Sequence, residues 1–321
     1  MRLPWTPPRD KEFDVVGMGC AAMDVVAVVE RLPALDEKIH ALEMDRHGGG
    51  PVGTALAVVA RMGFKAAFAG QVGDDFAGEF IIDEFRRAGV DLRGEVVHPH
   101  TQSQISLVLV DKATGKRTVV SGRGELADAT CDRLRHEMSR KGKILHVDGY
   151  DMDAAICFAD ECKMAGGAVV YDAGSVKEGS LEMLARADVA VVSRAFAEKM
   201  FGHRDWEAAC RALLETGPSY TGVTLGEQGA AGLDGEEFFE VPAFPVDPVV
   251  DTTGAGDVFH GALDVAVLKG WDFRTCMTFA SAVAAMKCRR LGGRAGIPTF
   301  DEATAFLKDA GGGFRRGLND G

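Results

Sequence analysis

The chain alternates between short apolar runs and longer segments in which apolar residues recur every three to four positions. The apolar runs are typical of strands, and they cover residues 13–18, 65–72, 144–147, 168–171, 189–192 and 221–225. Helical spacing follows in 54–62, which stops at Gly63, and in the segment that Asp75 begins and Gly89 ends. This alternation predicts an α/β fold: a doubly wound, mostly parallel central sheet flanked by helices.

Two segments depart from the alternation. Residues 24–47 contain the β-branched run Val25–Val29, and residues 98–123 alternate apolar with polar residues around a turn at Thr114. Both patterns predict antiparallel strands. We expect them to form a small β-sheet that serves as a lid over the carboxyl ends of the central strands.

The domain organisation follows from these patterns. A single α/β domain is expected over residues 12–310, with the two lid segments inserted into it. Residues 1–11 are rich in proline and charge and residues 311–321 are rich in glycine, so both tails are expected to be poorly ordered.

Charge and composition exclude several classes of partner. The 36 Lys and Arg residues against 48 Asp and Glu residues give a net charge of −12, which argues against nucleic acid. No run approaches the ~20 apolar residues of a membrane span and the start lacks the apolar stretch of a signal peptide, so we expect a cytoplasmic protein without membrane contact. The seven cysteines include no C-x-x-C pair and indicate reduced thiols rather than zinc ligands or a disulfide framework.

The most specific stretch is Asp251–Asp257, where glycines meet the start of an apolar helix that continues to Leu268. Backbone N–H groups at a helix N-terminus, with no side chains in the way, form a site for phosphate. A carboxylate at Asp257 fits such a site as the base that takes a proton from an attacking hydroxyl. The alternative is a glycine-rich loop in which Asp257 is a simple N-cap.

This stretch resembles the second signature of the ribokinase, or phosphofructokinase-B, family of carbohydrate kinases. Residues 49–63 and 70–78 resemble the first signature, Thr224–Gly229 resembles the family's nucleotide-side loop, and Gly292–Pro298 resembles its adenine-side segment. The resemblance implies a ribokinase-like fold and transfer of the γ-phosphoryl group of ATP, with Mg²⁺, to a hydroxyl of a small sugar.

The resemblance also implies roles for individual residues. Asp257 matches the general base, and the amides of Gly254, Ala255 and Gly256 match the anion hole. The residues matched to sugar binding are Asp24, Lys38, Gly49, Gly50 and Thr54, with Arg123 as a substitute charge. Those matched to nucleotide binding are Thr224, Gly226, Gly229 and Ser281. The loop that often holds a monovalent cation such as K⁺ matches the Asp251 side chain and the carbonyls of Thr253, Cys288 and Gly293.

Departures from the family pattern limit these expectations. The Asn-x-x-Glu element that helps organise Mg²⁺ is replaced by Ser193–Phe196, and Thr54 stands where ribose-specific members have Asn. The chain looks most like the branch that includes sulfofructose kinases, in which Lys38 matches a basic residue. Gly149 and Tyr150, however, follow residues 144–147 where an Arg is expected.

Other functions stay open alongside the sugar kinase. A nucleoside kinase of the same fold is one, and a non-catalytic sugar or nucleotide sensor is another, because the missing Asn-x-x-Glu element is also what decay of activity would leave. Residues 17–22 imitate a dinucleotide-binding fingerprint, but β-branched residues and not a helix follow. Exposed edges of the predicted lid favour a homodimer formed through it.

Overall fold

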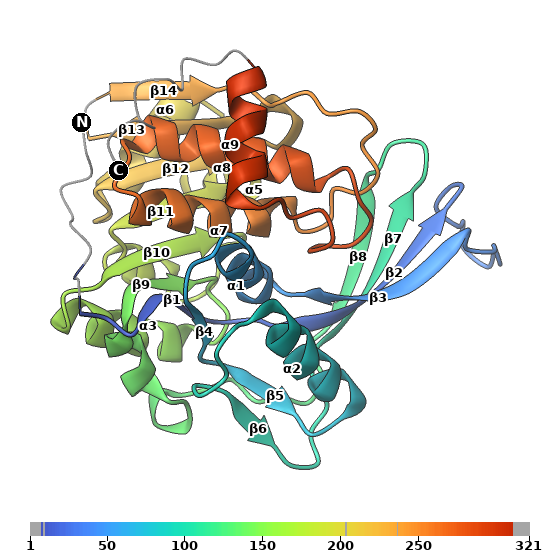
Figure 1. Ribbon diagram of the computed structural model, residues 1–321, viewed down its shortest axis with the longest axis horizontal. Coiled ribbons are helices and arrows are strands. Elements are labelled where there is room, and N and C mark those ends of the chain that lie inside the picture. The colour runs from blue at the N-terminus through green and yellow to red at the C-terminus, as the bar shows by residue number, and fades with distance from the viewer. Residues whose placement is uncertain (1–7, 9, 203, 236, 311–321) are drawn as a thin grey trace.

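Eight strands form one central sheet in the computed structural model, which describes residues 8, 10–202, 204–235 and 237–310 (Figure 1). Their order is β14 (Glu237–Val241), β13 (Ala230–Asp234), β12 (Tyr220–Thr224), β11 (Val189–Ser193), β10 (Ala168–Ala173), β9 (Gly142–Val147), β1 (Phe13–Met18) and β4 (Ala66–Phe68). Neighbours from β12 to β4 run parallel, whereas β13 and β14 pair antiparallel at one edge. The predicted doubly wound, mostly parallel sheet is confirmed.

Helices cover both faces of this sheet. One face carries α1 (Pro51–Arg61), α2 (Phe76–Ala88), α7 (Ala255–Leu268), α8 (Phe273–Lys287) and α9 (Phe300–Asp309), and the other carries α3 (Met152–Met164), α4 (Ser180–Leu184), α5 (Arg194–Phe201) and α6 (Trp206–Leu214). Successive strand residues point to opposite faces, so Ile144 packs with the first group and Leu145 with the second. In Figure 1, α7, α8 and α9 lie in front of the sheet.

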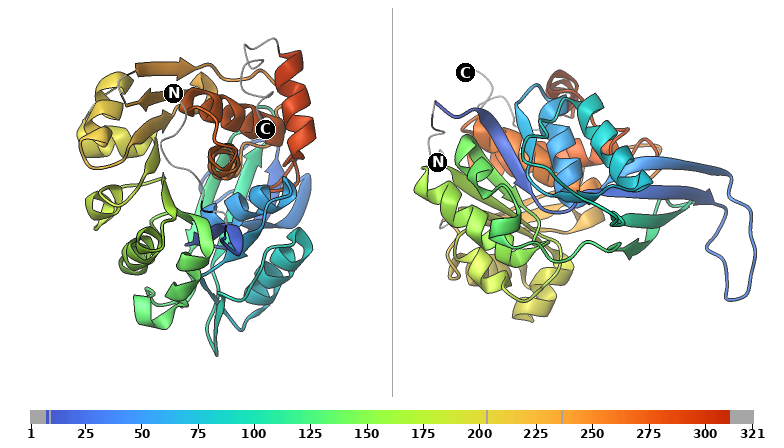
Figure 2. Two further views of the ribbon diagram at one scale, coloured as in Figure 1. Left: turned by 60° about the vertical axis from the view of Figure 1, so that its left-hand side comes forward. Right: turned by 90° about the horizontal axis from the view of Figure 1, so that it is seen from below.

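A separate four-stranded sheet projects from one end of the molecule (Figures 1 and 2). Its order is β3 (Glu43–Gly49), β2 (Ala22–Val29), β7 (Ile105–Asp111) and β8 (Arg117–Gly122). The hairpins β2–β3 and β7–β8 are antiparallel, and β2 joins them by pairing parallel to β7. This sheet is the small lid sheet expected from the sequence. Its register sets Asp24 beside His47 and Ser106.

Several local expectations hold and others need correction. The Asp75 carboxylate caps α2 by accepting from Gly78 N–H at 2.9 Å, and Gly89 ends the helix with a φ of 78°. The predicted single strand over 65–72 is instead two strands. The first, β4, ends at Phe68, and the second, β5 (Gln71–Gly73), pairs with β6 (Val96–His98) in a separate two-stranded sheet. The helix predicted over 54–62 begins earlier, at Pro51, whose missing N–H costs nothing in a first turn.

The cysteines and the tails complete the comparison with the sequence. The expectation of seven reduced thiols is wrong for one pair: Cys131 and Cys157 come together from distant positions in the chain and form a disulfide, while the five other cysteines are free and buried. Apart from residues 8, 10 and 11, the expected disordered tails lie outside the described residues. Within the described part of the chain, no helix has both the length and the apolar character that crossing a bilayer requires.

Candidate active site

The amino-terminal end of α7 has the geometry of an anion site. Gly254 is its N-cap, with a left-handed φ of 71°, and a Cβ there would lie 3.0 Å from the Gly293 backbone. A Cβ at Gly256 would meet nothing within 4 Å, so open space lies in front of this turn. The first N–H groups of a helix have no carbonyl partners within the helix. The Gly254 and Gly256 amides can therefore donate to a phosphoryl group that approaches closely, and the Ala255 N–H, which donates to the Thr252 carbonyl over a long 3.3 Å, can share its hydrogen with the same group.

Asp257 lies in the first turn of the same helix, partly exposed to solvent. Burial and the neighbouring Asp172 carboxylate raise its pKa to about 6, while His260 and Arg117 oppose the rise. A carboxylate with such a pKa is ionised at neutral pH and is a better proton acceptor than an ordinary aspartate. Asp257 therefore combines the position and the proton affinity that a general base needs.

A second carboxylate faces the same region from the lid. Asp24 on β2 is buried, and its pKa is raised to about 6 by burial and by Asp257, against Arg294 and a hydrogen bond from Ser106. A Cβ at Gly49 would lie 2.2 Å from the Asp24 carboxylate, so only glycine leaves room for it. The structure thus gives Gly49 a more specific reason than a tight turn, and it brings Asp24 and Asp257 into electrostatic contact.

Gly50 and Thr54 lie at the start of α1. Gly50 is the N-cap of α1 with a φ of 81°, and a Cβ there would come within 2.5 Å of the Cys20 carbonyl oxygen. Thr54 is buried one turn later. The Thr54 hydroxyl accepts from Arg294 Nε at 3.5 Å, so it lies beside the guanidinium that also contacts Gly49.

Arg294 is a functional candidate that the sequence interpretation missed. Its Nη2 donates to the Gly49 carbonyl at 2.7 Å, and its buried Nη1 has no hydrogen-bond partner among the described residues. Cβ atoms at Gly48 and Gly53 would lie 2.4 and 2.5 Å from the guanidinium, so these glycines make room for it. Burial lowers the pKa of Arg294 to about 10. The signal in the sequence was an arginine within the glycine-rich segment Gly292–Pro298.

Asp148 connects three backbone segments near the candidate site. Its carboxylate accepts from the N–H groups of Cys20 at 2.8 Å, Val52 at 3.3 Å and Tyr150 at 2.9 Å. These bonds tie the turn after β1 to the first turn of α1 and to the loop after β9. No helix opens at residues 17–22, so their dinucleotide-like pattern has no fingerprint geometry.

The two predicted cationic sugar contacts lie in different places. Arg123 is half-exposed, 2.9 Å from Asp128 and 3.8 Å from Asp151, and it lies over the Tyr150 ring, which Lys177 approaches to 3.7 Å from its own side. Lys38 is exposed in the loop between β2 and β3. The position of Lys38 follows from the strand register.

The register pairs Asp24 with His47 and Val28 with Glu43, so the loop that carries Lys38 lies beyond the far ends of both strands. Figure 2 shows the corresponding hairpin loop at the tip of the lid. Within one chain, Lys38 is therefore remote from Asp24.

The expected nucleotide contacts gather around the end of β12, with Ser281 separate on α8. Thr224 is the last residue of β12, and Gly226, with a φ of 62° and open space at its Cβ position, begins a short 3₁₀ turn. Gly229 closes this turn, and a Cβ there would lie 2.1 Å from the Val241 carbonyl oxygen. Ser281 is buried on α8. Gly226 is thus free to meet a ligand, whereas Gly229 is required by packing.

The segment in place of the Asn-x-x-Glu element has a structural role. Ser193 caps α5 by accepting from Phe196 N–H at 3.0 Å, and Phe196 is buried in the core. Arg194 donates to the Leu225 carbonyl at 2.6 Å and to Gln228 Oε1 at 2.9 Å, which fixes the loop around Gly226. In the part of the chain that the structure describes, no group of three or more His, Cys, Asp or Glu side chains is arranged to hold a metal ion. An Mg²⁺ ion fits this site only as an ion held through phosphates and water, which is how Mg²⁺ is commonly bound.

The predicted monovalent-cation site does not fit such an ion. The buried Lys287 ammonium donates to the Asp251 carbonyl at 2.9 Å and to the Thr253 carbonyl. The Asp251 carboxylate accepts from Thr253 N–H at 2.7 Å and from Gly292 N–H at 2.8 Å. The Cys288 carbonyl accepts from two backbone N–H groups. Most of the expected ligand oxygens are thus already engaged within the protein.

The lid hairpin also reaches the loop before α7. Thr252 donates through both its N–H and its hydroxyl to the Gly115 carbonyl in the β7–β8 turn, each at 3.0 Å. The loop that leads to the anion site is therefore tied directly to the lid.

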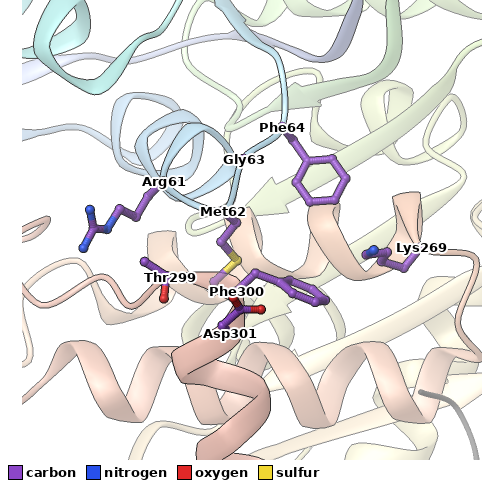
Figure 3. A pocket seen from close by; sticks show the side chains of 8 residues that line it. All are labelled: Arg61, Met62, Gly63, Phe64, Lys269, Thr299, Phe300 and Asp301. Carbon is purple, nitrogen blue, oxygen red and sulfur yellow. The ribbon is translucent and has the colours of Figure 1, made fainter. Parts of the chain in front are cut away.

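A cavity of about 450 Å³ lies elsewhere, between the end of α1 and the start of α9. Figure 3 shows Phe64 and Phe300 between Arg61 and Lys269 in its wall. Gly49 and Gly50 lie at the opposite end of α1, about 16 Å away for 11 residues at ~1.5 Å each. This cavity is thus separate from the carboxylate pair.

Comparison with known proteins agrees with this geometry. Residues 12–300 match the model of the pfkB family of carbohydrate kinases. An ATP-dependent ribose-1-phosphate kinase from Halopiger xanaduensis is 30% identical over 92% of this chain and 98% of its own length.

Two solved structures share the fold. A ribokinase from Thermotoga maritima is 26% identical with a TM-score of 0.80, over 92% of this chain and 99% of its own. A ribokinase from Arabidopsis thaliana, complexed with ribose and ATP, is 25% identical with a TM-score of 0.79, over 92% of this chain and 99% of its own. The family match spans most of the chain, and the chain is therefore a member of the pfkB family of carbohydrate kinases.

Proposed function

We propose that this protein transfers the γ-phosphoryl group of MgATP to a hydroxyl of a small sugar or sugar derivative, with Asp257 as general base. The observation that carries the proposal is the position of Asp257 in the first turn of α7, beside the open amino-terminal end of that helix, with the buried Asp24 carboxylate within electrostatic range of it. A site for binding alone needs no proton acceptor at this position.

Each group has a defined part in the reaction. Asp24 accepts hydrogen bonds from sugar hydroxyls and fixes the ring against Gly49 and Gly50. The oxygen of the sugar hydroxyl forms a bond to the γ-phosphorus while the bond from that phosphorus to the leaving ADP oxygen breaks. Asp257 takes the proton of this hydroxyl as it attacks. The amides of Gly254, Ala255 and Gly256 hold the charge on the transferring group. MgATP supplies the phosphoryl group and its metal ion.

The nucleotide is proposed to lie along the end of β12. Thr224, which ends β12, and Gly226, which begins the 3₁₀ turn that Arg194 fixes, are proposed to contact the nucleotide, and Ser281 is proposed for the adenine side. Closure of the lid sheet over Asp24 would keep water away from the γ-phosphate and so favour transfer to the sugar over hydrolysis.

The test measures ADP release from MgATP across ketoses, aldoses, sugar acids, sulfofructose, nucleosides and sugar phosphates. Ribose 1-phosphate belongs in the panel because a relative is named for it. The Asp257→Asn variant accompanies every assay. Asp153→Asn is a matched control, because Asp153 is exposed in the first turn of α3.

We expect one class of sugar to release ADP, with loss in Asp257→Asn and no change in Asp153→Asn. A nucleoside as the best acceptor would assign the protein to nucleoside kinases. MgATP binding with no release for any acceptor would instead support a sensor and contradict the proposal.

A further inference from the structure

Lys287 is a fully buried lysine at the end of α8, and its charge has an unusual environment. Its ammonium donates to the Asp251 carbonyl at 2.9 Å and to the Thr253 carbonyl. No carboxylate lies within ion-pair distance of Nζ among the described residues. Two backbone carbonyls that converge on one point, with their negative ends inward, form a site for a cation.

Burial of an ammonium is expensive unless its donors are satisfied and opposite charge lies near. The two carbonyls satisfy donors of Lys287, and the charges of Asp251 and Asp257 favour its protonated form. An apolar residue would fill the same space without this cost. The retained charge therefore indicates a role for it at this position.

The loop that Lys287 holds leads directly into the anion site. Thr253 precedes Gly254, the N-cap of α7, so an ammonium on the Thr253 carbonyl fixes the peptide plane at which the helix begins. The Asp251 carboxylate secures the same turn by accepting from Thr253 N–H and Gly292 N–H. The orientation of the amides that would receive phosphate thus depends on a cation at this point.

A metal ion has no free place at these carbonyls. An ion at the same oxygens would lie against the ammonium, and like charges at such distances repel strongly. The Cys288 carbonyl, a further expected ligand, accepts from Val250 N–H at 2.8 Å and from Asp251 N–H at 3.2 Å.

We propose that the Lys287 ammonium serves as a built-in monovalent cation that shapes the anion site, so that the kinase works without K⁺ or Na⁺. Lys287 is a positioning residue in this proposal, because it acts through the loop and touches no reacting atom. The inference rests on the proposed function only for its catalytic consequence. The occupancy of the cation position by Lys287 stands apart from the identity of the sugar.

The first experiment needs no sugar. Thermal unfolding of the full chain is measured in KCl, NaCl or tetramethylammonium chloride at one ionic strength. We expect the wild-type Tm to be the same in all three salts. The Lys287→Ala variant exposes the two carbonyls to an ion-sized space, so we expect a lower Tm that K⁺ or methylammonium raises by at least about 2 °C.

The second experiment measures turnover with the best acceptor in the same salts. Wild-type turnover should vary less than twofold, whereas Lys287→Ala should lose at least tenfold in tetramethylammonium and recover in part with K⁺ or methylammonium. Recovery should affect kcat more than the KM of the sugar, since Lys287 is proposed to act on the anion site that holds the transferring phosphoryl group. Lys308→Ala removes an exposed lysine from the last turn of α9 and should behave like wild type.

Three results would overturn the proposal. The first is a wild-type protein that depends on K⁺: its Tm is higher by more than about 2 °C, or its turnover is more than twofold higher, in K⁺ than in tetramethylammonium. The second is a folded Lys287→Ala that no cation restores. Where Lys287→Ala does not fold, Lys287→Gln keeps a donor on a side chain one bond shorter but lacks the charge. Full turnover of Lys287→Gln without K⁺ would be the third, because a neutral donor would then suffice.

Discussion

Replacement of Asp257 by Asn should make the protein more stable and much less active at pH 7. The fold holds this carboxylate at a pKa of about 6 against an ordinary value of 3.8, chiefly because burial penalises its charge. Asn has nearly the same shape and carries no charge. The substitution therefore removes the penalty together with the proton acceptor.

The magnitude follows from the pKa. Each tenfold change in proton affinity is worth about 1.4 kcal/mol, so the rise to about 6 corresponds to no more than about 3 kcal/mol. Solvent that reaches the partly exposed carboxylate reduces this value. Because the pKa is raised in the folded state, the penalty is fully present above pH 6 and disappears as the pH falls toward 4. Turnover should fall by about 10²–10⁴, the usual effect of losing a general base.

Urea unfolding at pH 7 and at pH 4.5 measures the first effect, and ADP release measures the second. We expect Asp257→Asn to exceed the wild-type unfolding free energy by about 1–3 kcal/mol at pH 7, with a smaller difference at pH 4.5. A variant less stable than wild type at pH 7 would refute the assignment of the raised pKa to a burial penalty. Turnover equal to wild type would remove Asp257 from its role as base.

Two substitutions test other parts of the site, and one measurement on the unchanged protein tests the predicted dimer. Gly49→Ala places a Cβ 2.2 Å from the Asp24 carboxylate and should raise the sugar KM by about 10²-fold. The MgATP affinity, measured by calorimetry, should stay the same, and an unchanged sugar KM would contradict the packing argument. Arg294→Gln removes the cation that lowers the pKa of Asp24, so the pKa on the acidic side of a plot of 1/KM against pH should rise from about 6 to a higher pH. An unchanged pKa in this plot would argue against the coupling of Arg294 to Asp24. The exposed strand β8, with Val119 and Val120 uncovered, should pair with a second lid, and light scattering that finds a monomer at working concentration would rule out the predicted dimer.

The sequence by itself determined the layered fold and the position of the glycine turn that is proposed to bind phosphate. Apolar runs and helical spacing depend on neighbours within a few residues, and so does the glycine turn that begins α7, which the sequence placed at Gly254. The cap at Asp75 is equally local, because a side chain bonds an N–H three residues away.

Only the tertiary structure decided which charges meet. Arg294 and Gly49 are 245 residues apart, and Lys287 and Thr253 are 34 apart, yet each pair is in hydrogen-bond contact. Lys38 shows the reverse, since a residue close to Asp24 in sequence lies beyond the far end of its strand. Contacts of this kind follow from strand register and helix packing, and no short-range pattern of residues encodes them.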